Sequence, residues 1–219
     1  MLKRNYKISF DIGGTFTDII LINNKENKFF LHKCLTTPND PSIGAIEGIK
    51  EILRKNNVDF KQLSQAIHGT TLITNALIER KGSKIGLLTT KGFKDNLEMG
   101  TEQRYDIHDL FLEFPKPLVE RSLVKEIDER ITSKGQIVNK INENEILLNV
   151  KKLVKKNIES LAICFLHSYK NPVHELIAKR VINKNFPNLY VSISSEIHPQ
   201  IKEYERTSTT TANAYVQPL

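Results

Sequence analysis

Two adjacent glycines separate the first two apolar segments of the chain, and this arrangement constrains the fold more than any other feature of the sequence. Residues 6–10 alternate between apolar and polar side chains, and residues 16–22 form a second apolar run. A polar turn separates that run from a third one at residues 29–35. Three short apolar runs joined by tight turns predict an antiparallel meander of three strands.

Helix and strand patterns alternate after the meander. Asp40 followed by Pro41 is typical of a helix start, because aspartate caps free N–H groups and proline suits the first helical position. We expect a strand over 65–68, a second helix just after it, and a strand over 84–89. An antiparallel meander followed by helix-connected strands predicts an α/β fold with a mixed sheet covered by helices.

The rest of the chain predicts a second, smaller α/β unit. Strand patterns at 124–131, 158–166 and 189–193 alternate with helix patterns, one of which begins at Asn142. Residues 201–216 contain neither glycine nor proline, and nothing in them is typical of an element that closes a fold. We therefore expect another domain to begin near that point.

Composition excludes several classes of protein. No apolar run approaches the roughly 20 residues that span a bilayer, so we expect a cytoplasmic protein with no membrane partner. Cys34 and Cys164 each lie in an apolar run, which favours buried, reduced thiols over a disulfide. The net charge of +7 would suit nucleic acid, but the arginines are scattered and the lysine cluster at 151–156 contains no aromatic residue. We expect no nucleic-acid partner.

The turn after the first strand gathers groups that suit a nucleotide phosphate. Residues 11–18 read DIGGTFTD, in which the polar side chains are Asp11, Thr15, Thr17 and Asp18. Gly13 and Gly14 leave their N–H groups bare to an anion, and the two threonines add hydroxyl donors. Because a phosphate repels a carboxylate, Asp11 fits better beside Mg²⁺, through a bound water. The alternative is a plain hairpin whose glycines adopt positive φ.

A second polar segment, HGTT at residues 68–71, lies where a predicted strand ends and a helix begins. The free N–H groups of a helix start would make Gly69, Thr70 and Thr71 a second anion site. In the alternative, a threonine only caps the helix and His68 is a core residue. The polar loop at 98–109 is a third candidate, because long loops in compact domains are typically functional.

Six stretches together resemble the N-terminal region of the hydantoinase A and 5-oxoprolinase family, which includes subunits of acetone and acetophenone carboxylases. DIGGT alone also occurs in sugar kinases, but the six stretches cover nearly the whole chain. They are DIGGTFTD at 11–18, HGTTLITNALIERKG at 68–82, GFKDNLEMG at 92–100, PLVERSLVKEIDERI at 117–131, FLHSYKNPVHE at 165–175 and SSEIHPQIKEYERTSTTTANAYVQP at 194–218.

The resemblance implies a fold and a chemistry. The fold is of the actin and sugar-kinase type (ribonuclease H-like), with an ATPase-like lobe at 1–110, a second α/β unit at 111–195, and at 196–219 the start of the main domain. The chemistry is the use of ATP and Mg²⁺ to phosphorylate a carbonyl oxygen of a cyclic amide, which is then hydrolysed. A hydantoinase B-type partner and an oligomeric assembly are implied as well.

The resemblance also assigns roles to individual residues. Catalytic roles are implied for Asp11, Asp18 and His68, with Asp11 near the magnesium ion, and nucleotide contacts for Gly13, Gly14, Thr15, Thr17, Gly69, Thr70 and Thr71. Gln103 and Arg104 fall in a substrate loop, where Thr101 and Tyr105 depart from the family pattern.

Two other functions stay open at this point. One is a subunit of an ATP-dependent ketone carboxylase, which phosphorylates an enolised ketone instead of an amide. The other is a truncated, non-catalytic lobe that acts as a binding or assembly partner. Because family members are several hundred residues longer, we expect an enzyme of the cyclic-amide type that is inactive as the isolated 219 residues.

Overall fold

The computed structural model describes residues 4–102, 106 and 108–218, and it forms two compact units, Met1–Lys81 and Gly82–Leu219. The first unit contains a four-stranded sheet in the order β3-β2-β1-β4. Its elements are β1 (Tyr6–Ile12), β2 (Phe16–Asn23), β3 (Lys28–Leu35), α1 (Pro41–Lys55), a 3₁₀ turn η1 (Phe60–Gln62), β4 (Leu63–Thr70) and α2 (Leu72–Ile78). Strands β1 to β3 pair antiparallel and β4 pairs parallel to β1, which confirms the predicted meander and mixed sheet.

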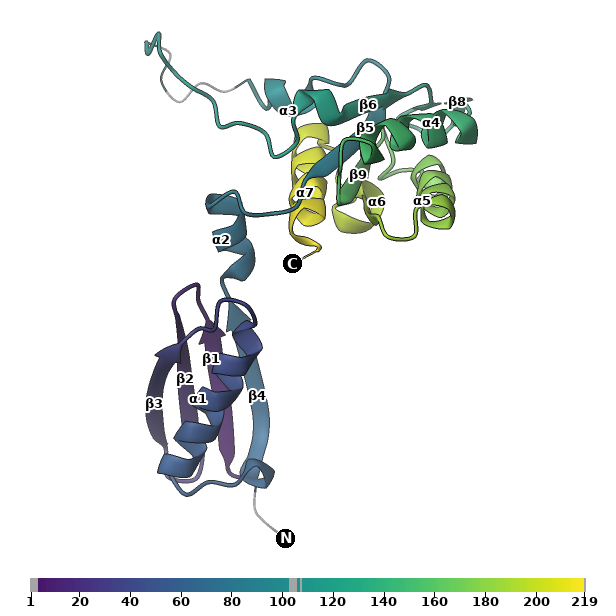
Figure 1. Ribbon diagram of the computed structural model, residues 1–219. Coiled ribbons are helices and arrows are strands. Elements are labelled where there is room, and N and C mark those ends of the chain that lie inside the picture. The colour runs from purple at the N-terminus through teal and green to yellow at the C-terminus, as the bar shows by residue number, and fades with distance from the viewer. Residues whose placement is uncertain (1–3, 103–105, 107, 219) are drawn as a thin grey trace. The chain divides into compact units, whose positions relative to one another are not determined.

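Helix α1 covers one face of this sheet (Figure 1). The side chain of Asp40 accepts a hydrogen bond from the Ser42 N–H at 3.0 Å, and Pro41 is the first helical residue, as the sequence predicts. The core between helix and sheet is aliphatic and includes Ile8, Ile19, Leu21, Ile52 and Leu53. Because side chains alternate along a strand, the residues between these core positions lie on the opposite face of the sheet.

The second unit is built on a parallel sheet in the order β10-β9-β5-β6. Strands β5 and β9 are buried along their whole length, as expected of central strands in a parallel sheet. Its elements are β5 (Ile85–Thr90), α3 (Asn96–Met99), η2 (Arg121–Leu123), β6 (Val124–Ile127), β7 (Arg130–Ile131), β8 (Ile137–Asn139), α4 (Glu143–Val154), β9 (Ser160–Cys164), α5 (Val173–Asn185), β10 (Tyr190–Ile193), α6 (Ser194–Ile197) and α7 (Glu203–Val216).

Two features of this unit differ from the sequence analysis. Strand β5, assigned there to the first lobe, pairs with β6 and β9, so the compact units separate at residues 81 and 82 instead of 110, and the second unit is the larger. Residues 203–216, where no closing element was expected, form α7, which packs against β9 and β10. Polar contacts hold it there: the Ser160 hydroxyl donates to the Ala214 carbonyl oxygen at 2.6 Å. Threonines replace the usual aliphatic stripe on its buried face, which hides the helix from a hydropathy pattern.

Both cysteines are free thiols, as the sequence predicts. Burial raises the pKa of Cys164, whose sulfur also accepts a hydrogen bond from the Thr207 hydroxyl. Burial, with the nearby carboxylates of Glu51 and Asp18, also raises the pKa of Cys34, which is only half-buried.

We expect Cys164 to resist alkylation in the folded chain. The thiolate is the reactive species, and burial both disfavours it and blocks access. Iodoacetamide at pH 8 followed by mass spectrometry should label Cys34 slowly and Cys164 only after denaturant is added. Equal labelling of both thiols in the native chain would contradict the packing of α7 against β9.

In the described part of the chain, no helix has the length and apolar character that crossing a membrane requires.

Candidate phosphate site in the first unit

The candidate site lies where β1 and β4 end and β2 begins, at one edge of the sheet. The register pairs Asp11 with Asp18 on β2 and with Gly69 on β4. Directly paired residues of neighbouring strands lie on the same face, with Cβ atoms about 4.5–5.5 Å apart. A side chain at Gly69 would lie 3.3 Å from Asp11 Oδ1. The sheet therefore brings two carboxylates and a bare glycine together on its face opposite α1.

The turn beside these residues is tight, and its two glycines lie so close to neighbouring atoms that a side chain would have little room. The Gly13 N–H donates to the Phe16 carbonyl oxygen at 3.0 Å and closes the turn. Neither glycine has a positive φ, so the alternative of a hairpin with left-handed glycines is wrong. A Cβ at Gly13 would lie 2.9 Å from the Phe16 oxygen, and one at Gly14 would lie 3.2 Å from Asn75 Nδ2. Gly14 and Thr15 are exposed, so the turn is open to solvent at these two residues.

Thr17 is placed differently from the other polar residues of the turn. Its side chain is fully buried, and its hydroxyl shares a hydrogen bond of 3.0 Å with that of Thr36. Thr36 in turn donates to the Gly13 carbonyl oxygen at 2.9 Å. Because Thr17 lies on the α1 side of β2, the structure makes it a support for the turn, and the phosphate contact predicted for it has no geometric support.

Asp18 lies on the same face as Asp11 but already has a cationic partner. Lys33, opposite it on β3, forms an exposed ion pair with it at 3.0 Å. Two carboxylates opposite one another repel, and Lys33 relieves that repulsion at Asp18. Asp11 is therefore the carboxylate left to face a cation. Mg²⁺ bound to a nucleotide needs only one or two protein carboxylates and keeps several waters, so this donor set fits such an ion.

The end of β4 contacts the turn through backbone and hydroxyl groups. The Thr70 hydroxyl donates to the Ile12 carbonyl oxygen at 3.2 Å, and the Thr71 N–H donates to the same oxygen at 3.3 Å. Asn75, one turn into α2, donates to the Thr71 hydroxyl at 3.4 Å. Thr71 makes no side-chain cap, and α2 has only seven residues. The HGTT segment thus anchors the turn, and its N–H groups add little as a separate anion site.

His68 lies on the other face of the sheet. It pairs with Phe10 across β1 and β4, and the two rings stack with centroids 4.8 Å apart. Phe10 packs against the α1 core, so the imidazole does not share a face with Asp11. The catalytic role of His68 stays a prediction; the residue is exposed, so the structure does not make it the core residue of the alternative. Gln103 and Arg104 lie outside the described residues.

Comparison with known proteins settles the family. Residues 7–186 match the hydantoinase/oxoprolinase N-terminal region. The chain belongs to this family. The resemblance found in the sequence is confirmed, and with it the actin-like mixed α/β fold.

Two relatives in this family are about three times longer than this chain. An uncharacterized protein of Methanocaldococcus jannaschii is 43% identical, and the match covers 98% of this chain and 31% of that protein. Caprolactamase subunit alpha of Pseudomonas jessenii is 36% identical over 100% of this chain and 32% of its own length. The chain thus spans about a third of these two relatives and about a fifth of the 5-oxoprolinases it matches.

Two solved structures have the same fold over nearly all of this chain and over about a third of their own length. The nucleotide-free structure of acetone carboxylase, described as carrying out ATP-dependent acetone carboxylation, matches with a TM-score of 0.89 at 27% identity, over 98% of this chain and 32% of that one. The Pseudomonas jessenii protein, described as an ATP-dependent caprolactamase, matches with a TM-score of 0.86 at 34% identity, over 97% and 31%.

Proposed function

We propose that this chain supplies the phosphate-binding part of an ATP-dependent cyclic amide hydrolase of the hydantoinase and oxoprolinase type. One observation carries the proposal: Asp11, Asp18 and Gly69 share one face of the sheet beside the exposed turn at Gly13–Thr15. The family relatives include enzymes whose descriptions name ATP and a lactam, which supports this choice of reaction.

Each residue of the proposed site has a separate task. The N–H groups of Gly14 and Thr15, with the Thr15 hydroxyl, would hold terminal phosphate oxygens. Asp11 would orient a hydrated Mg²⁺ ion, while the Thr17–Thr36 pair fixes the shape of the turn. ATP supplies a phosphoryl group that converts the poorly reactive amide oxygen into a leaving group. The chain's own contribution is thus positioning and charge neutralisation.

The test is a turnover assay on the complete protein that contains this chain. Phosphate release should require Mg²⁺ and should rise with 5-oxoproline, a hydantoin or ε-caprolactam. The second candidate is a ketone carboxylase, favoured by the match to acetone carboxylase. Stimulation by acetone with bicarbonate, and by no cyclic amide, would select that candidate. ATP-independent activity on a cyclic amide would contradict both.

We also propose that the protein works with a hydantoinase B-type partner in an oligomer, because relatives are named as subunits. The cytoplasm is the proposed compartment, and two free thiols are consistent with a reducing environment.

The isolated 219 residues should bind Mg-ATP only weakly. The chain spans between about a fifth and a third of the length of its relatives, and the groups proposed here contact only phosphate and Mg²⁺. We expect a dissociation constant of about 1 mM or weaker in isothermal titration. Micromolar binding would show that these residues already surround the nucleotide.

A further inference from the structure

The second unit contains a cavity at the place where parallel α/β sheets usually bind ligands. In the order β10-β9-β5-β6, the connection after β5 leads to β6 on one side, and the connection after β9 leads to β10 on the other. Adjacent strands whose connections leave in opposite directions form a switch point, and ligands bind outside the carboxyl ends of strands there. The segments that follow β5 and β9 line the cavity described next.

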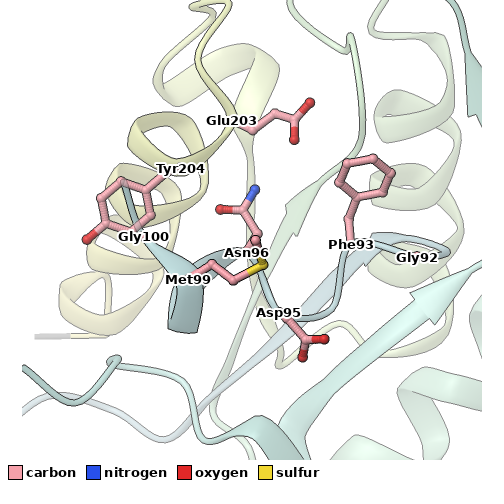
Figure 2. Close-up of a pocket in the computed structure, with 8 residues that line it drawn as sticks. All are labelled: Gly92, Phe93, Asp95, Asn96, Met99, Gly100, Glu203 and Tyr204. Atoms are coloured by element: carbon pink, nitrogen blue, oxygen red, sulfur yellow. The ribbon is translucent and has the colours of Figure 1, made fainter. Parts of the chain in front are cut away.

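The cavity has a wide part and a narrow part. The wide part has a volume of about 330 Å³ and is lined by Gly92, Phe93, Asp95, Asn96, Met99, Gly100, Glu203 and Tyr204. Figure 2 shows these residues arriving from two segments, residues 92–100 after β5 and the start of α7. The narrow part, of about 10 Å³, shares Phe93, Asn96 and Glu203 with it and reaches Cys164 and Arg206.

Two polar atoms at this cavity are buried without a hydrogen-bond partner among the described residues: Asn96 Oδ1 and Arg206 Nε. Arg206 is 1% exposed, and its other guanidinium nitrogens donate to the carbonyl oxygens of Gln200 at 2.8 Å and Phe165 at 3.0 Å. A buried donor or acceptor left unpaired costs about 1–3 kcal/mol. Asn96 and Arg206 both line the narrow part, so a ligand there would lie next to these two unpaired groups.

The chemistry of the two groups defines the ligand. Arg206 Nε offers one N–H donor at the narrow part, whose volume admits about one oxygen atom. Glu203 lines both parts and would repel an anionic ligand, so a neutral carbonyl oxygen fits better than a carboxylate. Asn96 Oδ1 accepts from a ligand N–H, and Phe93, Met99 and Tyr204 give the wide part apolar walls (Figure 2).

We infer that this cavity binds a small carboxamide, with the carbonyl oxygen toward Arg206, the N–H toward Asn96 and the hydrocarbon part between the apolar walls. Asp95 takes no part, because Arg121 pairs with it. The site lies in the second unit and is distinct in sequence from the turn at 13–15. The choice of a cyclic amide as probe rests on the proposed function.

The test is a titration of the ¹⁵N-labelled 219-residue chain with ε-caprolactam, without nucleotide, followed by amide chemical shifts. We expect saturable shifts at residues 92–100 and 203–207. N-methyl-caprolactam, which lacks the N–H, should bind about three- to tenfold more weakly, as expected for one lost hydrogen bond. Asn96→Leu should weaken caprolactam binding by a similar factor and abolish the difference between the two probes.

Glu205→Gln is the matched control. Glu205 lies on α7 two residues after Glu203, pairs with Lys202 and is not among the cavity-lining residues. It should leave binding unchanged. If Asn96→Leu perturbs the fold by circular dichroism, Asn96→Ala, which also removes the acceptor, replaces it, with weaker binding again expected. Absence of saturable shifts, or equal binding of both probes to the wild-type chain, would overturn the inference. Since no nucleotide is present, this result is independent of whether ATP turnover is found.

Discussion

Asp11→Asn should lower Mg²⁺-dependent ATP turnover of the complete protein about a hundredfold or more, which is the range for losing one preorganised charge contact in a polar active site. The amide keeps the size of the side chain but loses the charge that orients a hydrated cation. Asp11 is exposed, so little loss of stability accompanies the change. The measurement is phosphate release against Mg²⁺ concentration, with the stability of the variant checked by thermal unfolding.

Glu47→Gln is the matched control for this experiment. Glu47 is an exposed acid on α1, which covers the opposite face of the same sheet. The same loss of one negative charge should leave turnover within about twofold, because dissolved salt screens the effect of exposed charges that lie far from a site. Wild-type activity in Asp11→Asn, or equal losses in both variants, would remove Asp11 from the site.

Glu129→Ala should lower the stability of the second unit by about 2–5 kcal/mol, because two buried hydrogen-bonding groups lose their partner at once. Glu129 is 2% exposed; one carboxylate oxygen accepts from the Thr90 hydroxyl, and the other lies 2.6 Å from His174 Nδ1. Thr90 also accepts from the Leu166 N–H at 2.9 Å. The acid thus connects the ends of β5 and β9 to the start of α5.

Native-state hydrogen exchange of the β5 and β9 amides measures this loss within the second unit. Glu113→Ala, an exposed acid in the same unit, should change the free energy by about 0.5 kcal/mol or less. Unchanged exchange in Glu129→Ala would show that the network contributes nothing to stability.

The strands and helices of the first unit were predictable because local signals agree there. The alternation in β1, the apolar run of β2, the two glycines between them and the Asp40–Pro41 start each indicate one feature of the fold. The boundary of the unit was not predictable, because β5 has the same apolar character whichever sheet it joins. Only its pairing with β6 and β9 assigns it to the second unit.

The sequence predicts which residues cluster at the candidate phosphate site. It does not predict on which face of the sheet each of their side chains lies. Sequence places Thr17 one residue from Asp18 and His68 one residue from Gly69. Because successive side chains of a strand alternate between its two faces, such neighbours lie on opposite faces of the sheet. Thr17 is therefore buried, and His68 stacks on Phe10. Register across three strands decides which of them meet, and register is not a local property of any of the segments.

The polar groups of the second unit carried no usable sequence signal. Glu129 and His174 are 45 residues apart, and Asn96 and Arg206 are farther apart still. His174 is buried beside Glu129, a pairing that no local motif indicates. Arg206 lies within a run of threonines on α7, but only the structure shows that its side chain is almost fully buried, which is rare for an arginine.

The most direct test of the phosphate site is a crystal structure of the complete protein with Mg²⁺ and a non-hydrolysable ATP analogue. We predict the terminal phosphates within hydrogen-bond distance of the Gly14 and Thr15 N–H groups, with the metal's water shell against Asp11. A nucleotide bound elsewhere, with the turn at residues 13–15 free of phosphate, would contradict the account.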